Sequence, residues 1–513
     1  MTNILKSVFF TALLFSCQQP SNTTSKENTL GQISISVNGS QEAIPHFEKG
    51  MLLLHSFEYS DATEAFQKAQ EVDSTFAMAY WGEAMCKNHP LWREQEYTEA
   101  KEIIEKLGPH KEAQLSKFKS EFEKDMFHTL TVLFGPGTKK ERDLRYAEEM
   151  EKLTKKYPDN HEVHAFYALS LIGASKGGRD QDLYSKGAKI AEGILKENPN
   201  HPGALHYKIH GSDHPEYAHL ALDAANSYAK VAPDAAHALH MPSHIYVALG
   251  MWDEVISSNI ASWEASKSKK EAKNLSNNKL NYHAFKWWMY GHLQKQEFSK
   301  SKKLVLEMKK YCEEEPSSKA MAHLVMMRGA HCVEANDWDD ALFEDDLDYS
   351  DLAVQVMGAH QFVNVLRAFK KNDGGKMEKH MEQLADYITL KSKKMAEEDT
   401  QMCGSSYDRS RPTPLHIDRA MVMLNQCKAL KYKLEGNDKL AMATLKEAVE
   451  LEESTSYMYG PPEIIKPSKE LLAEWLLETG HIDQALKLFE GVLERAPKRR
   501  IAVEGIQKID TKK

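Results

Sequence analysis

Two short segments of this 513-residue chain contain histidines whose spacing suits shared chemistry. Residues 201–214 read HPGALHYKIHGSDH, and residues 237–244 read HALHMPSH. Each segment contains an HxxxH pair, and the two pairs are His206 with His210 and His240 with His244. Because residues four apart share one face of a helix, both imidazoles of a pair are expected to point the same way.

The two pairs occupy equivalent places in the chain, because His206 and His240 lie 34 residues apart, as do His210 and His244. Asp213 continues the first face seven residues after His206. Adjacent helices pack with axes about 8–10 Å apart, so imidazoles from both could meet between them. Neutral imidazoles, with or without a carboxylate, suit Zn²⁺, Cu²⁺ or Ni²⁺. One hypothesis is therefore a divalent transition-metal site with these four histidines as candidate ligands.

Two other roles suit the same histidines and stay open at this stage. The imidazoles can hydrogen-bond a bound partner or one another without a metal, or they can serve packing alone. His201 and His214 each precede a proline, which favours loop or cap positions. Pro242 predicts a kink that moves His244 away from the shared face. Of the three interpretations, a polar groove for a partner or ligand is the one that the pattern favours.

Signatures of common enzyme classes are absent from the sequence. Gly374-Gly375-Lys376 comes nearest to a phosphate-binding loop, and Gly404-Ser405-Ser406 comes nearest to a serine nucleophile turn. The fragment nearest to a zinc-protease helix is His161-Glu162-Val163-His164. The formal net charge of −9 offers no general attraction to nucleic acid. We therefore expect a binding protein rather than an enzyme, and we assign no catalytic residue and no nucleic-acid partner.

Helices are expected to position these side chains. From residue 42 onward apolar residues recur about every 3.6 positions, in a chain of ordinary globular composition with 42% apolar and 27% charged residues. Small and larger residues also recur at offsets of 0, 12, 16 and 19, as in Gly50, Ala62, Phe66 and Ala69, in Ala429, Ala441, Leu445 and Ala448, and in Ala473, Ala485, Phe489 and Val492. Such offsets let two antiparallel helices touch closely while the larger side chain fills the space between them.

This pattern resembles the tetratricopeptide repeat, a helix–turn–helix unit of 34 residues. The resemblance is strongest in residues 43–74, 202–233, 236–267, 422–453 and 466–497. It implies an all-α, right-handed superhelix of about ten helical pairs, in which the first helix of each pair lines a concave groove. The residues that it places toward the groove are Trp81, His206, His210, Asp213, His237, His240, His244, His283 and His323.

Polar and charged stretches divide the predicted array. We expect an N-terminal array over residues 42–265, central repeats over 281–396 and C-terminal repeats over 414–505. The connections are a charged loop over residues 266–280 and a polar loop over residues 397–413.

The N-terminus resembles a bacterial lipoprotein signal. Residues 7–16 form an apolar run too short for a membrane span, which needs about 20 residues. The run ends in Leu14-Phe15-Ser16-Cys17, which is similar to a lipobox and implies that residues 1–16 are removed and that Cys17 is lipidated. Residues 17–41 are polar, as expected of a tether. A plain cleaved signal with an incidental cysteine is the alternative.

The segments AMAYWGEAM, HPGALHYKIH and HALHMPSHIYVALGMWDE together resemble a group of bacterial multi-repeat scaffold proteins. Lipid-anchored proteins of this kind often accompany outer-membrane nutrient systems, including those for polysaccharides. The resemblance implies an envelope scaffold, anchored to the membrane by lipid and facing either the periplasm or the exterior. Its groove would hold a protein, peptide or glycan segment. The alternative is a metalloprotein, in its extreme form a metal-dependent enzyme, that uses the histidine groove with Zn²⁺ or another divalent transition metal.

Overall fold

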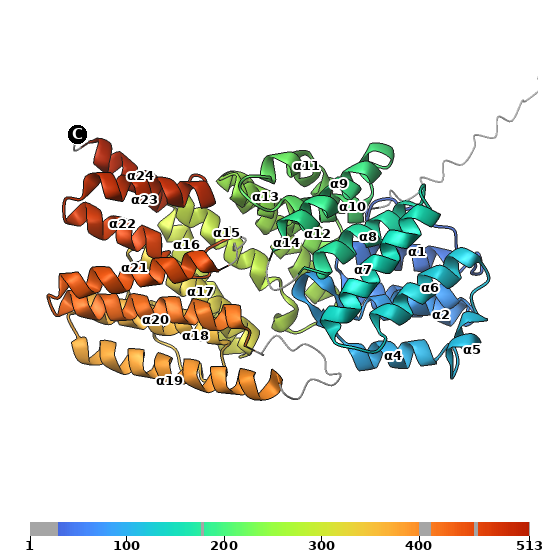
Figure 1. Ribbon diagram of the computed structural model, residues 1–513, viewed down its shortest axis with the longest axis horizontal. Helices are drawn as coiled ribbons and strands as arrows, with labels where there is room; N and C mark the ends of the chain where they lie inside the picture. Colours follow the sequence, from blue (N-terminus) through green and yellow to red (C-terminus); the bar gives the residue numbers. More distant parts are fainter. Residues whose placement is uncertain (1–28, 176–178, 400–411, 456–459, 512–513) are drawn as a thin grey trace, which may run out of the picture.

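The computed structural model describes residues 29–175, 179–399, 412–455 and 460–511. These residues are helical almost throughout, and successive helices lie side by side in pairs along a curved array (Figure 1). Within the described residues, strands are limited to an antiparallel ribbon of β1 (Asn88–His89) and β2 (Glu94–Gln95). The predicted all-α array of helical pairs is confirmed.

The first half of the array runs from α1 to α14. Its helices are α1 (Ile44–His55), α2 (Tyr59–Val72), α3 (Ala77–Met85), α4 (Tyr97–Glu105), α5 (Lys111–Leu115), α6 (Glu121–Leu133), α7 (Lys139–Lys156), α8 (His161–Gly173), α9 (Gln181–Glu197), α10 (Pro202–Ser212), α11 (Leu222–Val231), α12 (Ala236–His240), α13 (Pro242–Ala248) and α14 (Trp252–Lys273). Short 3-10 turns are η1 (Pro90–Trp92) and η2 (Ala218–Ala221).

The second half begins after the 3-10 turn η3 (Asn277–Lys279). Its helices are α15 (Tyr282–Gln294), α16 (Phe298–Glu314), α17 (Ser318–Ala335), α18 (Val354–Lys370), α19 (Gly374–Asp399), α20 (Pro414–Leu434), α21 (Asp438–Ser454), α22 (Ser468–Glu478), α23 (Ile482–Arg495) and α24 (Arg500–Asp510), with η4 (Asp340–Leu342) between α17 and α18.

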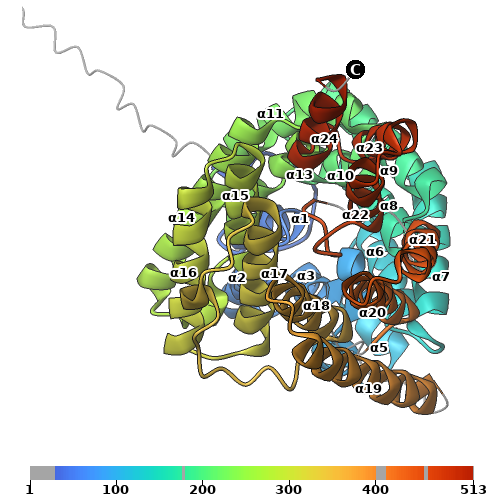
Figure 2. The same ribbon diagram turned by 90° about the vertical axis from the view of Figure 1, so that its left-hand side faces the viewer.

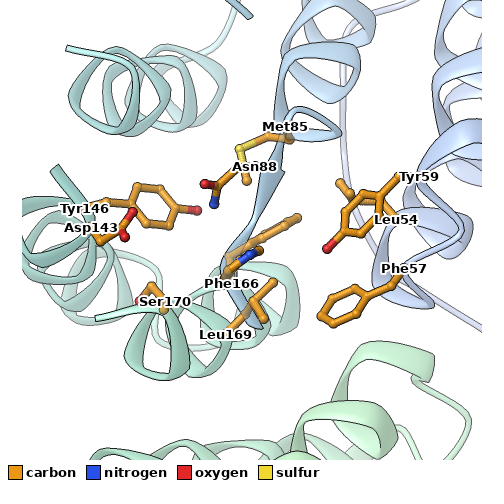
Figure 3. Close-up of a pocket in the computed structure, with 12 residues that line it drawn as sticks. Leu54, Phe57, Tyr59, Met85, Asn88, Asp143, Tyr146, Phe166, Leu169 and Ser170 are labelled. Atoms are coloured by element: carbon orange, nitrogen blue, oxygen red, sulfur yellow. The ribbon is translucent and has the colours of Figure 1, made fainter. Parts of the chain in front are cut away.

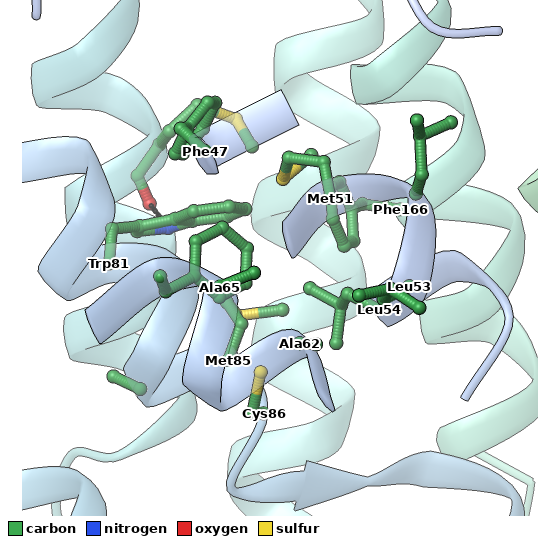
Figure 4. Packing of buried hydrophobic residues seen from close by; sticks show 14 of the residues in the cluster. Phe47, Met51, Leu53, Leu54, Ala62, Ala65, Trp81, Met85, Cys86 and Phe166 are labelled. Atoms are coloured by element: carbon green, nitrogen blue, oxygen red, sulfur yellow. Dashed lines mark hydrogen bonds between the residues drawn. The ribbon is translucent and has the colours of Figure 1, made fainter. Parts of the chain in front are cut away.

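The recurring small residues pack as their spacing predicts. Phe66 is fully buried, and a Cβ added to Gly50 or Gly82 would lie within 2.7 Å of its ring. Figure 4 shows the surrounding apolar core of α1 to α3, with Ala62 and Ala65 among its side chains. Glycine and alanine thus let three helices approach one aromatic ring, which is how a small repeat buries its apolar face against its neighbours.

Trp81 does not face the groove, so that prediction was wrong. Its side chain is fully buried in the core (Figure 4), and its indole N–H donates to the Met126 carbonyl at 3.1 Å. The helix α6, which carries Met126, packs on α3 and covers the face that the repeat pattern assigns to the groove.

The charged segment 266–280, predicted as a loop, is helical as far as Lys273. Ion pairs with α2 and the turn before it hold this part of α14. The Lys269 ammonium lies 2.8 Å from the Glu58 carboxylate and 2.6 Å from that of Asp61, and Lys273 lies 2.6 Å from Glu64. The lysines that suggested a solvated loop are thus partners for an acidic helix about 200 residues earlier in the chain.

Part of the predicted tether belongs to the folded array. The Gln32 N–H donates to the Asn200 carbonyl at 2.9 Å, the Asn38 N–H donates to Glu123 at 2.6 Å, and Leu30 is buried. Cys17 and the predicted signal peptide lie outside the described residues. The predicted polar loop 397–413 begins inside α19, and most of it lies outside the described residues. None of the described helices has the length and apolarity needed to cross a membrane.

The array curls back on itself, as the end-on view in Figure 2 shows. Arg499, just before α24, is fully buried and lies 2.6 Å from the Glu470 carboxylate and 2.7 Å from that of Glu334. It also donates to the Tyr290 hydroxyl on α15 at 2.7 Å. The C-terminal helices are therefore joined to the middle of the array by a buried, charged contact.

Candidate metal centre

Six histidines from the first helices of three successive pairs gather in two groups of three. The inner trio consists of His206 and His210 on α10 and His237 on α12. The outer trio consists of His240 on α12, His244 on α13 and His283 on α15. Within each trio, one ring nitrogen from every histidine lies within 4.8 Å of the other two. The four histidines of the two HxxxH pairs thus divide between the two trios, one pair in each, and do not form the single four-histidine site that the 34-residue spacing predicted.

The inner trio is enclosed by the protein. The Nε2 atoms of His206 and His237 are 3.2 Å apart, and the ring centroids of His206 and His210 are 4.7 Å apart. His206 and His210 are buried, and the Nε2 atom of His210 has no hydrogen-bond partner within the described part of the chain. A buried polar nitrogen without a partner is costly, so its presence here points to a ligand that the site is built to hold.

The outer trio repeats this geometry closer to the surface. The Nε2 atoms of His240 and His244 are 3.2 Å apart, and the ring centroids of His240 and His283 are 4.7 Å apart. His240 is buried, His244 is half-buried and His283 is exposed. The site therefore opens on the side of His283.

Hydrogen bonds fix the tautomers of three of the six rings. The Nδ1–H of His206 donates to the His55 carbonyl at 2.7 Å, and that of His244 donates to the Asp213 carboxylate at 2.6 Å. The Nδ1–H of His240 donates to Oδ1 of Asn259 at 2.6 Å, because the amide group of Asn259 itself donates to a backbone carbonyl. Oxygen acceptors hold the proton on Nδ1, so each neutral ring presents an Nε2 lone pair to its trio.

Burial favours the neutral form of four of these imidazoles. It lowers the pKa of His206 to about 3, against a value near 6.5 for a free side chain. Burial also lowers the pKa well below that value, and the charge that neighbouring histidines would carry lowers it further, for His210, His237 and His240. At neutral pH, the Nε2 lone pairs of His206 and His240 are therefore available to a metal ion.

A third group, the buried triad of His55, Glu162 and His201, has the opposite arrangement. All three side chains are fully buried, and the Glu162 carboxylate accepts from His55 Nε2–H at 2.7 Å and from His201 Nε2–H at 3.2 Å. The Nδ1 atom of His201 accepts the Ala204 N–H, and the Tyr207 hydroxyl donates to Nδ1 of His55 at 2.9 Å. Every ring nitrogen has a partner, so neither imidazole of this triad has a free lone pair for a metal.

The buried triad nevertheless supports the inner trio, because the carbonyl of His55 accepts a hydrogen bond from the Nδ1–H of His206. Burial raises the pKa of Glu162, but the two histidines outweigh burial and hold that pKa below its usual value. Sequence analysis missed this group. His55 lies more than 100 residues before Glu162, so no local pattern links the two. Glu162 was considered only as part of the His161–His164 fragment, which does not match the zinc-protease motif.

The remaining predicted residues are placed as follows. Asp213 lies behind His244 and orients it, rather than joining a trio. His323 lies on α17, where its ring donates to the Lys319 carbonyl at 2.7 Å, outside both trios. Pro242 separates α12 from α13, yet His244 still faces His240, so the expected displacement does not occur. His237 and His283, predicted only to face the groove, complete the two trios.

Aromatic rings enclose the cluster. The Phe57 ring lies 4.2 Å from His206, and Trp287 lies 4.6 Å from His244, measured between ring centroids. Phe57 also lines a neighbouring cavity of about 20 Å³, into which the hydroxyls of Tyr59 and Tyr146 point from opposite sides (Figure 3). That volume is close to the room that one water molecule needs. The cavity is therefore too small for a substrate, and the histidine cluster is the better candidate site.

No family model and no curated protein matches this chain. Among solved structures, it is similar to yeast Tom70 at 13% identity and a TM-score of 0.35, over 92% of this chain and 89% of that one. It is similar to a human IFIT1 dimer with PPP-AAAA at 12% identity and a TM-score of 0.35, over 90% and 94% of the two chains. The P58(IPK) TPR domain matches at 13% identity and a TM-score of 0.19, over 92% and 98%. The fold assignment rests on the helical pairs and not on these scores.

Proposed function

We propose that this protein binds a transition metal in the concave face of its helical array. The observation that carries the proposal is the facing of His240 and His244, whose Nε2 atoms lie 3.2 Å apart while oxygen acceptors hold both protons on Nδ1. When both rings are neutral, these tautomers direct their Nε2 lone pairs at each other, which is unfavourable unless a proton or a metal ion lies between them. A metal ion at about 2.0–2.1 Å from each nitrogen supplies that cation.

The ligand set favours particular metals. Both trios consist of imidazole alone, which suits copper, zinc and nickel better than the oxygen-seeking ions calcium and magnesium. Among divalent ions, copper binds nitrogen ligands most tightly. A carboxylate, an amide oxygen and a backbone carbonyl each accept an Nδ1–H from one of these rings, and such acceptors are usual behind metal-binding histidines.

Metal analysis of the full chain, purified without a polyhistidine tag, tests this proposal. We expect stoichiometric uptake of Cu²⁺ or Zn²⁺, measured by elemental analysis and titration calorimetry. The double variant His206→Ala with His240→Ala removes one ligand from each trio and should lose most of it. His128→Ala with His219→Ala is the matched control, because both side chains are exposed and lie outside the trios. Equal metal uptake by the two double variants would refute the assignment.

The cellular setting is a separate part of the proposal and rests on the sequence. The lipobox-like sequence ending at Cys17 supports an envelope protein held to the membrane by lipid, and two or more acyl chains give a stable anchor where one does not. A scaffold role beside an outer-membrane nutrient or polysaccharide system, with a protein, peptide or glycan segment as partner, belongs to this part as well.

Cell fractionation tests the anchor. Cys17→Ala should move the protein from the membrane fraction to the soluble fraction, and Cys86→Ala is the control because that cysteine is buried in the core. If the Cys17 variant keeps the distribution of the unmodified chain, the lipid anchor is wrong. The metal-binding proposal does not depend on this result.

A further inference from the structure

We propose that the two trios act as one dinuclear centre that binds a small bridging anion. This inference rests on the metal binding proposed above, and it adds the number of ions and the class of ligand. The trios are in direct contact, since ring centroids are 5.7 Å apart between His210 and His244 and 6.3 Å apart between His237 and His240. All six imidazoles therefore form a continuous cluster, with three nitrogens for each of two ions.

Each trio leaves its ion short of ligands. Three protein nitrogens and one open position are the usual arrangement of a reactive zinc site, and copper also accepts further ligands. Two ions held by adjoining trios would share an additional ligand, as ions do in two-metal sites where they lie about 3.5–4 Å apart. A single atom or a short anion between the ions would complete both coordination shells at once.

The charge balance calls for that ligand to be negative. Two divalent ions bring four positive charges, while neither trio contains a carboxylate. Within the described residues, Asp213 is the one acid that is hydrogen-bonded to a trio ring, and its contact is with Nδ1 of His244 on the side away from the paired Nε2 atoms. Uncompensated positive charge in a largely buried site is costly, so the bound ions should recruit an anion from solution.

One unused group beside the outer trio favours an anion as well. The indole Nε1–H of Trp287 is buried and lacks a hydrogen-bond partner in the described part of the chain, although its ring centroid lies 4.6 Å from that of His244. An indole N–H can donate a hydrogen bond to an anion, and it offers no acceptor to a cationic ligand.

The surroundings limit the ligand to a small one. Gly460, which has a φ of +74°, lies so close to Trp287 that an added Cβ would be 2.0 Å from the indole ring. The segment that begins at Gly460 thus fixes Trp287 over the outer trio. Three of the six rings are buried, His237 and His244 are half-buried and His283 is exposed, so little of the cluster is open to solvent and an anion of two or three heavy atoms suits the site.

Copper loading of the untagged full chain, with azide as the probe anion, tests the proposal. We expect two Cu²⁺ per chain by elemental analysis, a Cu²⁺ paramagnetic resonance signal that integrates to well below one spin per copper, and one azide bound per copper pair. His283→Ala should reduce the copper that the outer trio retains, restore a full signal for the remaining ion, and weaken azide binding more than tenfold.

Trp287→Phe keeps the ring and removes only the donor. It should leave copper uptake unchanged and weaken azide binding about threefold to tenfold, the effect of one lost hydrogen bond. Trp288→Phe, on the same helix but outside the contacts of the trios, is the matched control. An effect of equal size in both variants would remove the indole from the proposal.

The outcomes separate this inference from the function on which it rests. One copper per chain with a full signal, or two coppers with independent full signals and no azide bound, overturns the dinuclear centre and leaves metal binding in place. No copper bound at all overturns both.

Discussion

The buried triad and the two trios are all built on histidines, but their imidazoles point their N–H groups in opposite directions. In the buried triad, two rings turn their N–H groups toward Glu162, and every ring nitrogen has a partner. In the trios, three rings turn their N–H groups outward to oxygen acceptors and leave lone pairs facing inward. The difference shows what decides the role of a histidine cluster. Rings whose N–H groups point outward to oxygen acceptors leave lone pairs inside for a metal, whereas rings whose N–H groups point inward to a carboxylate form a structural network.

The two groups also share one residue. His55 belongs to the triad through its side chain and to the inner trio through its carbonyl, which accepts from His206. The structural network therefore fixes one end of the candidate metal site. The two groups therefore give different predictions. Substitutions in the triad should lower the stability of the fold, and substitutions in the trios should lower the affinity for metal.

The largest expected effect is that of Glu162→Ala. The change leaves two buried N–H donors without an acceptor and should lower the free energy of unfolding by about 3–5 kcal/mol, as measured by urea denaturation. His240→Ala, measured without metal, should cost less, because it leaves one buried acceptor, Oδ1 of Asn259, without its donor, whereas Glu162→Ala leaves two donors. Copper uptake by the folded fraction of the Glu162 variant should stay stoichiometric. A larger loss of stability in the His240 variant would contradict the contrast between the two groups.

Acid should act on a third arrangement, in which a buried carboxylate is paired with cations. Burial opposes ionisation of Glu470, but Arg499 and Lys466 outweigh it and lower its pKa to about 2 from an ordinary value of 4.5. A lowered pKa stabilises the fold above the unfolded-state value, and that stabilisation is lost as the pH falls from about 4.5 to about 2. The loss should reach about 3 kcal/mol.

Glu470→Gln isolates this effect from other carboxylates that titrate in the same range. The difference in unfolding free energy between the unmodified chain and the variant should be greatest at neutral pH and should shrink toward pH 2. A difference that does not change with pH would show that the Glu470 charge contributes no pH-dependent stability. Copper affinity at neutral pH should be the same in both proteins, because Glu470 lies outside the trios.

Asp213→Ala should have the smallest effect on the fold and a selective effect on the site. Loss of the acceptor frees the His244 ring to rotate, and loss of such outer-shell partners lowers metal affinity about 10–100-fold. Calorimetric titration with Cu²⁺ measures this change, with the exposed Asp223→Ala as control. An unchanged affinity would mean that packing alone orients His244.

The sequence predicted the architecture and the core of the site because both depend on spacing. The offsets around Phe66 and the 34-residue separation of the HxxxH pairs follow from helical geometry, so they can be recognised without coordinates. His237 and His283 were predicted to face the groove, but their membership of the trios depends on how three helices pack. The tautomers could not be predicted, because the acceptors of His206 and His240 come from α1 and α14.

The errors have physical causes of the same kind. Trp81 follows the groove pattern of its own helix, but α6 covers it. The lysines of residues 266–273 have the composition of a solvated loop, yet acidic residues near the start of the chain pair with them. Both depend on contacts between distant repeats, which a pattern within one repeat does not contain.

Those contacts change the mechanics of the molecule. A linear repeat array is loosest at its ends, where a terminal unit has a neighbour on one side only. Here Arg499 joins the last helices to Tyr290 on α15, the helix that also carries His283. Because α15 carries both Tyr290 and His283, we expect a displacement of the C-terminal helices to move the open side of the histidine cluster as well.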